Sequence, residues 1–417
     1  MNTYDDLMLL ATTAPVFVLP DPSAIDPLED EKEILRDLGI DVLAHDPQSG
    51  AVLIYSEASR KTYRKADINR LQRTHLLEMC GVDAKDKIDG EDNYTTGRVR
   101  EAIALVACYA SQSDGQVNGL GCWRAVNEKG HKLDSILVVS GNQAGEVTAD
   151  GKLVLHDRPR VHGNVLNLGH PQHWCDFDQL KDRLRHAGDH QWGESVIDEA
   201  VTLFQKWHWE GKLRPMLLCG LVMATFVQTT LSWRPLVGIS GPSHTGKSTL
   251  FEVLEGLFGP LSLLSSKVTE AGFRQALGDN ANAAMIDEFE KSRYRNQLLE
   301  LLRTSAKGTK VLRGTASQEG KQFGLRHIVW VASIELGLQA EADRNRFIVL
   351  ETKRIPDDQV GTLVLPTDEK LAELGQCLLA IAVRYAVEAD RLAGQLKAVS
   401  RKGFNARTIS AMQCQRR

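Results

Sequence analysis

The sequence of 417 residues lacks most of the features that mark secreted, membrane-bound or repeat-built proteins. Its seven cysteines are scattered, odd in number and never spaced as CxxC, which excludes a disulfide framework and a thiolate zinc site. We therefore expect reduced thiols and a cytoplasmic location. The first residues, MNTYDDLMLLATTAP, place acids before a short apolar run, whereas a signal peptide starts with basic residues. The sequence has no internal repeat and no low-complexity segment.

A large excess of one charge and a clear membrane span are also missing. The net charge is −4, with 42% hydrophobic and 25% charged residues, which argues against a disordered or generally cationic protein. Any nucleic-acid surface must therefore be local. The basic segment 60–73 could contact phosphates or form a solvated face. The apolar run 216–233 contains Gln228 and three threonines, so we predict a buried helix there and no membrane partner.

The length predicts about two to four domains. The pattern of elements favours a small α/β unit over 1–90, a helix and a β-rich unit over 91–200, a larger α/β core over 201–356 and a helical segment over 357–417. In the first unit we predict helices over 29–40 and 65–82 and a strand over 51–57. Strands are predicted over 119–126, 134–142 and 152–161, separated by turn residues. His162, His170, His173 and Cys175 fit no zinc spacing, which favours histidines that lie on the surface or form hydrogen bonds.

The stretch GPSHTGKS, residues 241–248, fits the pattern G-x-x-x-x-G-K-[ST]. In this pattern glycines let backbone N–H groups surround phosphate oxygens, the lysine reaches the β- and γ-phosphates, and the hydroxyl holds Mg²⁺. The context agrees, because PLVGIS before it predicts a buried strand and KSTLFEVLEGLFG after it predicts a helix. ATP and Mg²⁺ are the expected cofactors, and a glycine-rich turn without a ligand is the alternative. The predicted nucleotide contacts are Gly241, Pro242, Ser243, His244, Thr245, Gly246, Lys247, Ser248, Thr249 and Asp287, with Ser248 and Asp287 also contacting the metal.

The stretch NAAMIDEFE, residues 282–290, is an apolar run that ends in two acids. A parallel strand delivers its last residues to the same edge of the sheet as the phosphate loop. Asp287 could there hold the Mg²⁺ shell, and Glu288 could polarise a water molecule toward the γ-phosphate. A kinase needs no second acid aimed at water, so the pair favours hydrolysis. An exposed acidic turn is the alternative.

A predicted helix over 294–308 is followed by two short strand-like runs around the turn TASQEG, which predicts a β-hairpin before the next core strand. The hairpin carries Lys310, Arg313, Lys321 and Arg326. The first three of these are candidate DNA contacts, and an ordinary surface hairpin is the alternative.

Two further signals follow the hairpin. The buried-strand run HIVWVASIE includes Ser333, which could hydrogen-bond the attacking water or the γ-phosphate. Arg344 and Arg346 stand where the chain enters a last apolar strand. An arginine at a subunit edge could reach the γ-phosphate of the neighbouring subunit, and a salt bridge to Asp343 or Glu341 is the alternative.

The order of these motifs resembles the ATPase part of prophage- and plasmid-type primase–helicases, near superfamily 3 within the AAA+ ATPases. The order is the phosphate loop, TEAGFRQALG, IDEFE, LRTSAKGTKVLRGT, WVASIELGLQAEADRNRF and a helical tail. The most specific fragments are WRP, just before the first core strand, and ADRNRF. The likeness covers residues from about 200 to 400. It implies a P-loop AAA+ core, a ring that is usually hexameric, ATP between subunits and single-stranded DNA in a pore contacted by the hairpin.

The resemblance also implies roles by position. Lys247, Ser248, Asp287 and Glu288 carry over as nucleotide and Mg²⁺ residues. Arg346 matches the arginine finger, with Arg344 as second choice, and Ser333 stands at sensor 1, where asparagine is usual. The sequence has no primase active-site motif and no clear sensor-2 arginine motif, and it stops where relatives continue. A fragment or a shortened version is therefore expected.

The sequence thus predicts an ATP-hydrolysing, ring-forming DNA helicase or translocase of a mobile genetic element, active in prophage or plasmid replication. Its expected partners are single-stranded DNA, further copies of itself and other replication or mobile-element proteins. The main alternative is a DNA-associated ATP switch, such as an initiator, a loader or a phage-defence ATPase, that does not unwind DNA. A protein-remodelling machine is a third class, but it would favour an aromatic pore loop over this polar, basic hairpin.

Overall fold

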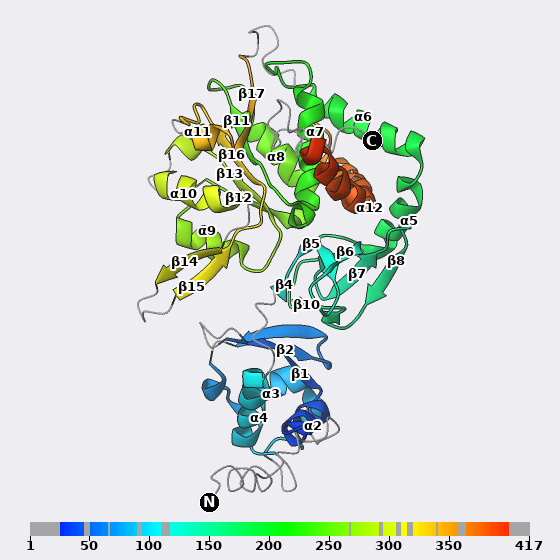
Figure 1. The fold of residues 1–417 in the computed structure, drawn as a ribbon, viewed down its shortest axis with the longest axis vertical. Helices are drawn as coiled ribbons and strands as arrows, with labels where there is room; N and C mark the ends of the chain where they lie inside the picture. Colours follow the sequence, from blue (N-terminus) through cyan, green and yellow to red (C-terminus); the bar gives the residue numbers. More distant parts are fainter. Residues whose placement is uncertain are drawn as a thin grey trace, which may run out of the picture.

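The computed structural model describes residues 26–45, 51–65, 67–89, 94–109, 117–266, 268–291, 295–305, 310–314, 320–338, 341–354, 356 and 364–399. Three parts follow one another along the long axis of the molecule (Figure 1). A small α/β unit lies at one end, a β-rich unit lies in the middle, and a larger α/β core with four accompanying helices lies at the other end.

The N-terminal unit packs helices on one face of a three-stranded antiparallel sheet in the order β1-β2-β3. Alternate residues of β2 face opposite sides: Val52 and Ile54 pack with the helices, and Leu53 and Tyr55 pack toward the β-rich unit. The elements are α2 (Glu29–Asp37), β1 (Ile40–His45), β2 (Val52–Ser56), β3 (Lys61–Lys65), η1 (Ile68–Arg70), α3 (Arg73–Cys80), η2 (Val82–Ala84) and α4 (Thr96–Tyr109).

The single helix predicted over 65–82 is wrong. Leu71 and Gln72 have extended backbone angles, so a 3₁₀ turn ends at Arg70 and α3 begins afresh at Arg73. The cause is local, because Gln72 is the N-cap residue of the new helix and its backbone N–H donates to Nδ1 of His75 at 3.1 Å.

The β-rich unit holds a four-stranded antiparallel meander, β5-β6-β7-β8, and a small three-stranded sheet, β4-β10-β9. Gly141, with φ +63°, lies in the tight turn that joins β6 to β7. Strand β7 is not predicted from the sequence, because its residues QAGEV have weak strand preference. It pairs with β6 on one side and β8 on the other. The strands are β4 (Val117–Asn118), β5 (Gly121–Val126), β6 (Lys132–Ser140), β7 (Gln143–Val147), β8 (Leu153–His156), β9 (Arg160–Val161) and β10 (Asn164–Leu166).

The core is a five-stranded parallel sheet in the order β12-β13-β16-β11-β17, as the predicted α/β core requires. Its strands are near-continuous apolar runs because helices cover both faces. Met285 and Trp330 pack toward α7 (Arg214–Phe226), α8 (Lys247–Phe258) and α12 (Asp368–Val399). Their neighbours Ala284 and Val331 pack toward α9 (Glu270–Leu277) and α10 (Arg295–Ser305). The strands are β11 (Leu236–Ser240), β12 (Ser262–Ser265), β13 (Ala283–Ile286), β16 (Val329–Ser333) and β17 (Phe347–Glu351). The intervening helices are α8 (Lys247–Phe258), η4 (Gly259–Leu261), α9 (Glu270–Leu277), η5 (Phe289–Lys291), α10 (Arg295–Ser305) and α11 (Glu341–Arg344).

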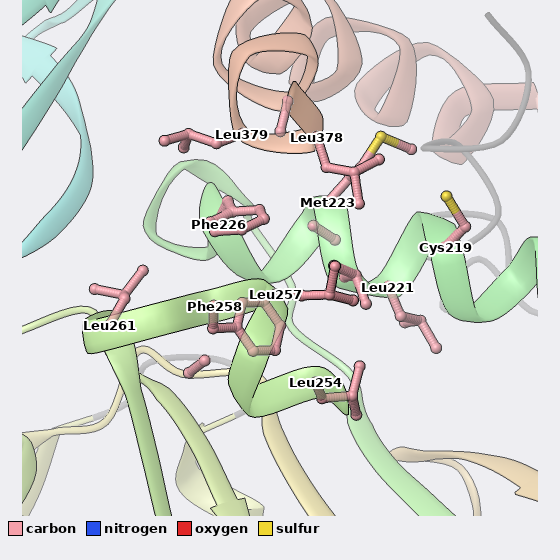
Figure 2. Packing of buried hydrophobic residues seen from close by; sticks show 14 of the residues in the cluster. Cys219, Leu221, Met223, Phe226, Leu254, Leu257, Phe258, Leu261, Leu378 and Leu379 are labelled. Atoms are coloured by element: carbon pink, nitrogen blue, oxygen red, sulfur yellow. The ribbon is translucent and has the colours of Figure 1, made fainter. Parts of the chain in front are cut away.

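Four further helices complete one side of the core: α5 (Phe177–Ala187), α6 (His190–Phe204), α7 (Arg214–Phe226) and α12 (Asp368–Val399). Figure 2 shows Met223 and Phe226 of α7 lying between Leu257 of α8 and Leu378 of α12. A side chain at Gly375 would overlap the carbonyl of Leu257, so a glycine there lets α12 approach α8 closely.

The buried helix predicted within 216–233 is confirmed as α7, which ends before the 3₁₀ turn η3 (Gln228–Thr230). Buried Gln228 is satisfied, because its amide donates to the carbonyls of Ala281 and Asn282 at 2.8 and 3.0 Å. Across the described part of the chain, none of the helices has the combined length and apolarity needed to cross a bilayer.

Candidate functional site

The loop that joins β11 to α8 depends on two glycines. Gly241 has φ +155°, and a β carbon there would overlap Thr352. Gly246 has φ +77° in the left-handed region, and a β carbon there would lie 3.0 Å from Nε1 of Trp207. Both positions therefore require glycine. The predicted strand–loop–helix context of residues 235–259 is confirmed.

The start of α8 is open to an acceptor from outside. Gly246 provides the N-cap, and no side chain in the described part of the chain caps the helix, so the N–H groups of its first turn lack this usual partner there. Ser248 is exposed and Thr249 is half-buried in that turn. Pro242, Ser243 and His244 are exposed, and His244 has φ +61°.

Thr245 braces this loop from within. It is buried, its hydroxyl donates to the carbonyl of Pro242 at 3.0 Å, and it shares a 2.8 Å hydrogen bond with the hydroxyl of Thr352. Thr352 follows β17, so the loop is tied to the neighbouring strand of the sheet.

Lys247 lies back over its own loop. Its Nζ donates to the carbonyls of Gly241 and Pro242 at 2.8 and 2.7 Å. Partial burial lowers the pKa of Lys247 below its usual value, and the negative charges of Glu290 and Asp287 act in the opposite direction. An anion in the loop could take over the two hydrogen bonds that the carbonyls now accept.

The predicted acids follow β13 directly. The N–H of Asp287 donates to the carbonyl of Ser265 at 3.1 Å, and its carboxylate accepts the N–H of Glu288 at 2.8 Å. Glu288 is exposed and has φ +51°, a conformation that residues other than glycine rarely adopt. Such strained residues cluster at functional sites.

Glu290 is a third acid that the sequence analysis does not select. Its Oε2 atom is buried and has no hydrogen-bond partner among the described residues, and its charge acts on Lys247. Its position two residues after Glu288 is the sequence feature from which Glu290 could have been predicted as a site residue.

The register of the parallel strands sets which residues share the edge of the loop. Ser240, the last residue of β11, pairs with Ser333, the last residue of β16, and Ile286 of β13 pairs with Val331. Asp287 therefore reaches the same edge as the loop. Ser333 is buried, and its hydroxyl donates to the carbonyl of Glu335 at 2.7 Å.

Arg346 lies at the opposite edge of the sheet. Its carbonyl accepts the N–H of Leu236, the first residue of β11, at 2.9 Å. Four residue steps separate Leu236 from Ser240, which is about 13 Å along the strand. Arg344 ends α11 at this same edge and is exposed. The fold thus brings neither arginine to Lys247 of the same chain.

The predicted alternative for these arginines is a salt bridge to Asp343 or Glu341. Asp343 accepts two hydrogen bonds from the guanidinium of Arg303, at 2.7 and 2.8 Å. These bonds lower the pKa of Asp343 below its usual value, and the positive charge of Arg346 acts in the same direction.

The predicted hairpin is confirmed in its backbone. Strands β14 (Lys310–Gly314) and β15 (Gly320–Gly324) pair in antiparallel register with Arg313 opposite Lys321. The side chains of Lys310, Arg313 and Lys321, and the turn 315–319, lie outside the described residues. In Figure 1 the hairpin extends from the lower side of the core.

The base of the hairpin is fixed by buried hydrogen bonds. The hydroxyl of Ser305 donates to the carbonyl of His327 at 2.6 Å, and Nε2 of His327 lies 2.8 Å from the carbonyl of Asn280. Arg326 is half-buried beside this junction, and burial lowers its pKa.

Two other predicted candidates have structural partners. Arg64, from the basic segment 60–73, forms an ion pair with Asp279 of the core, and Arg73 donates to the carbonyls of Ile88 and Lys85 at 3.1 and 2.9 Å. His162 lies 3.1 Å from both carboxylate oxygens of Glu146. Over the described ranges, no three His, Cys, Asp or Glu side chains group as metal ligands would.

No protein-family model matches the chain, and no curated protein matches it. Among solved structures, similar chains include two apo structures of the NrS-1 C-terminal region. The A form has a TM-score of 0.42 at 11% identity and covers 86% of this chain and 69% of its own. The other has a TM-score of 0.41 at 13% identity and covers 89% of this chain and 78% of its own. This likeness is too weak to assign a family or a function, so the resemblance inferred from the motifs stays a prediction.

Proposed function

We propose that this chain binds ATP in the loop between Gly241 and Ser248 and hydrolyses it, as a ring of identical subunits, to move along single-stranded DNA. One observation carries the proposal. The loop with its lysine and the acid Asp287 meet at the carboxyl edge of a parallel sheet, the edge at which α/β sheets bind ligands.

The residues at this edge suit a nucleoside triphosphate with Mg²⁺. The first turn of α8 has no side-chain cap among the described residues, and the ammonium of Lys247 donates to two carbonyls of its own loop. Ser248 and Asp287 offer the hydroxyl and carboxylate oxygens that Mg²⁺ prefers. Bound Mg²⁺ would neutralise charge that develops on the phosphate oxygens.

The chain's own groups then have separate tasks in the proposed reaction. Lys247 exchanges two loop carbonyls for phosphate oxygens and so contributes a positive charge where negative charge accumulates. Glu288, exposed at the same edge, orients the attacking water and accepts its proton.

In this proposal the opposite edge of the sheet contacts the neighbouring subunit and the DNA. Arg346 lies about 13 Å along the strand from its own loop, which is too far for its side chain to span. Its guanidinium would therefore contact the γ-phosphate of ATP bound by a neighbouring subunit. The basic hairpin is rooted at that edge through Ser305 and His327, where DNA contact would not obstruct the nucleotide.

A strand-displacement assay tests this function against the alternative of an ATP switch. The protein is incubated with ATP and Mg²⁺ on a forked duplex, with Lys247→Ala as the matched control. We expect displacement by the wild type alone. ATP-dependent assembly on DNA without displacement would favour the initiator or loader reading, and absence of ATP binding would overturn the proposal.

A further inference from the structure

Trp207 touches the backbone of the candidate nucleotide loop from 39 residues upstream. Its indole N–H donates to the carbonyl of Gly246 at 2.8 Å. The same carbonyl accepts the N–H of Leu250 at 2.9 Å, as the first turn of α8 requires. A carbonyl oxygen has two lone pairs, so this one is fully used.

These two hydrogen bonds fix the direction of the next N–H. The carbonyl of Gly246 and the N–H of Lys247 belong to one trans peptide group, in which the two bonds point in opposite directions. Holding the carbonyl toward Trp207 therefore aims the N–H of Lys247 away from it, into the loop. Gly246 is left-handed, and glycine alone would let this peptide rotate with little steric resistance.

The tryptophan is itself held firmly. Its side chain is 4% exposed within the apolar cluster that α7 and α8 share. The following residues run along the end of β17, because the carbonyl of His208 accepts the N–H of Lys353 at 2.6 Å and the N–H of Glu210 donates to the carbonyl of Glu351 at 2.8 Å. The indole therefore acts as a fixed donor.

We propose that Trp207 is a positioning residue of the nucleotide site, which fixes the peptide between Gly246 and Lys247 so that its N–H faces the phosphates. The inference rests on the proposed function, because it presumes that phosphates occupy the loop. In this pattern the backbone N–H groups surround the α- and β-phosphates, which ATP and ADP share. Loss of the indole donor should therefore weaken both nucleotides equally.

Trp207→Phe and Trp209→Phe make a matched pair. The indole of Trp209 donates to the carbonyl of Phe204 at 2.7 Å, so its removal costs a similar hydrogen bond away from the loop. Dissociation constants for ATP and ADP are measured by calorimetry, together with the thermal unfolding midpoint of each variant. We expect Trp207→Phe to weaken both nucleotides by about two- to tenfold, the range that one neutral hydrogen bond supplies, and Trp209→Phe to bind them as the wild type does.

Equal affinities in the two variants would overturn the inference, and so would a loss confined to ATP, because the loop N–H groups face phosphates that ADP also carries. Absence of nucleotide binding by the wild type would instead reject the proposed function itself. If Trp207→Phe does not fold, benzothienylalanine at position 207 replaces the N–H by sulfur at nearly constant volume, and the same comparison decides.

Discussion

Substitution of Arg346 by alanine should nearly abolish ATP turnover while leaving ATP binding almost intact. Its backbone lies beside Leu236, four residue steps or about 13 Å along β11 from the end of the strand that carries the loop. An arginine side chain is too short to cover that distance and reach a γ-phosphate beyond it. If Arg346 acts in catalysis, it therefore acts on a neighbouring subunit, where such a finger contributes about 10³–10⁵ in turnover.

A mixing experiment measures this geometry. Lys247→Ala subunits keep the finger and lose the loop lysine, and Arg346→Ala subunits do the reverse. In randomly mixed rings at equal amounts, about one interface in four joins an intact loop to an intact finger. The mixture should therefore recover about a quarter of wild-type ATPase, although each variant alone is inactive. Well-mixed rings that stay inactive, or an Arg346→Ala variant with normal turnover, would refute the trans arrangement.

Three other outcomes are expected. Glu288→Gln should bind ATP and not hydrolyse it, because the attacking water loses its proton acceptor. Filter binding of radiolabelled nucleotide measures this retention, and release at the wild-type rate would show that Glu288 has no such role. Neutralising Arg313 and Lys321 together should lower the salt dependence of single-strand binding by about one unit of slope per lost phosphate contact, and an unchanged slope would remove the hairpin from the DNA interface. Burial lowers the pKa of His327 to about 4 from 6.5. Between these two pH values the imidazole is protonated in the unfolded chain but neutral in the folded chain. The free energy of unfolding should therefore fall by up to about 3 kcal/mol as pH drops from 6.5 to 4. His327→Gln keeps an N–H donor toward Asn280. Denaturant titrations should show a steeper fall in stability with decreasing pH in the wild type than in this variant, and equal slopes would contradict the prediction.

The parts of the site that sequence predicts are those formed by continuous stretches of chain. Residues 235–259 predict their own strand, loop and helix, because two glycines, an apolar run and the helix signals all lie within 25 positions. The hairpin is predicted for the same reason, because its turn residues and strands are adjacent.

The missed parts depend on residues that are distant in sequence. Trp207 reaches the carbonyl of Gly246 across 39 positions, and Thr352 reaches the hydroxyl of Thr245 across 107. No spacing rule links side chains to a loop so far away in the sequence. The break at Leu71 is a different failure. Helical periodicity over 65–82 does not indicate that Leu71 and Gln72 have extended backbone angles and that a new helix begins at Arg73.

DNA-stimulated ATP turnover is the measurement that distinguishes a ring-shaped translocase from other ATPases. Turnover is measured with single-stranded oligonucleotides of increasing length, on protein resolved by size, with Lys247→Ala as control. We expect turnover to rise once the oligonucleotide is long enough to pass through a ring, and only in the assembled fraction. The variant should show no turnover. Turnover that ignores DNA, or that survives the loss of Lys247, would contradict the proposed function.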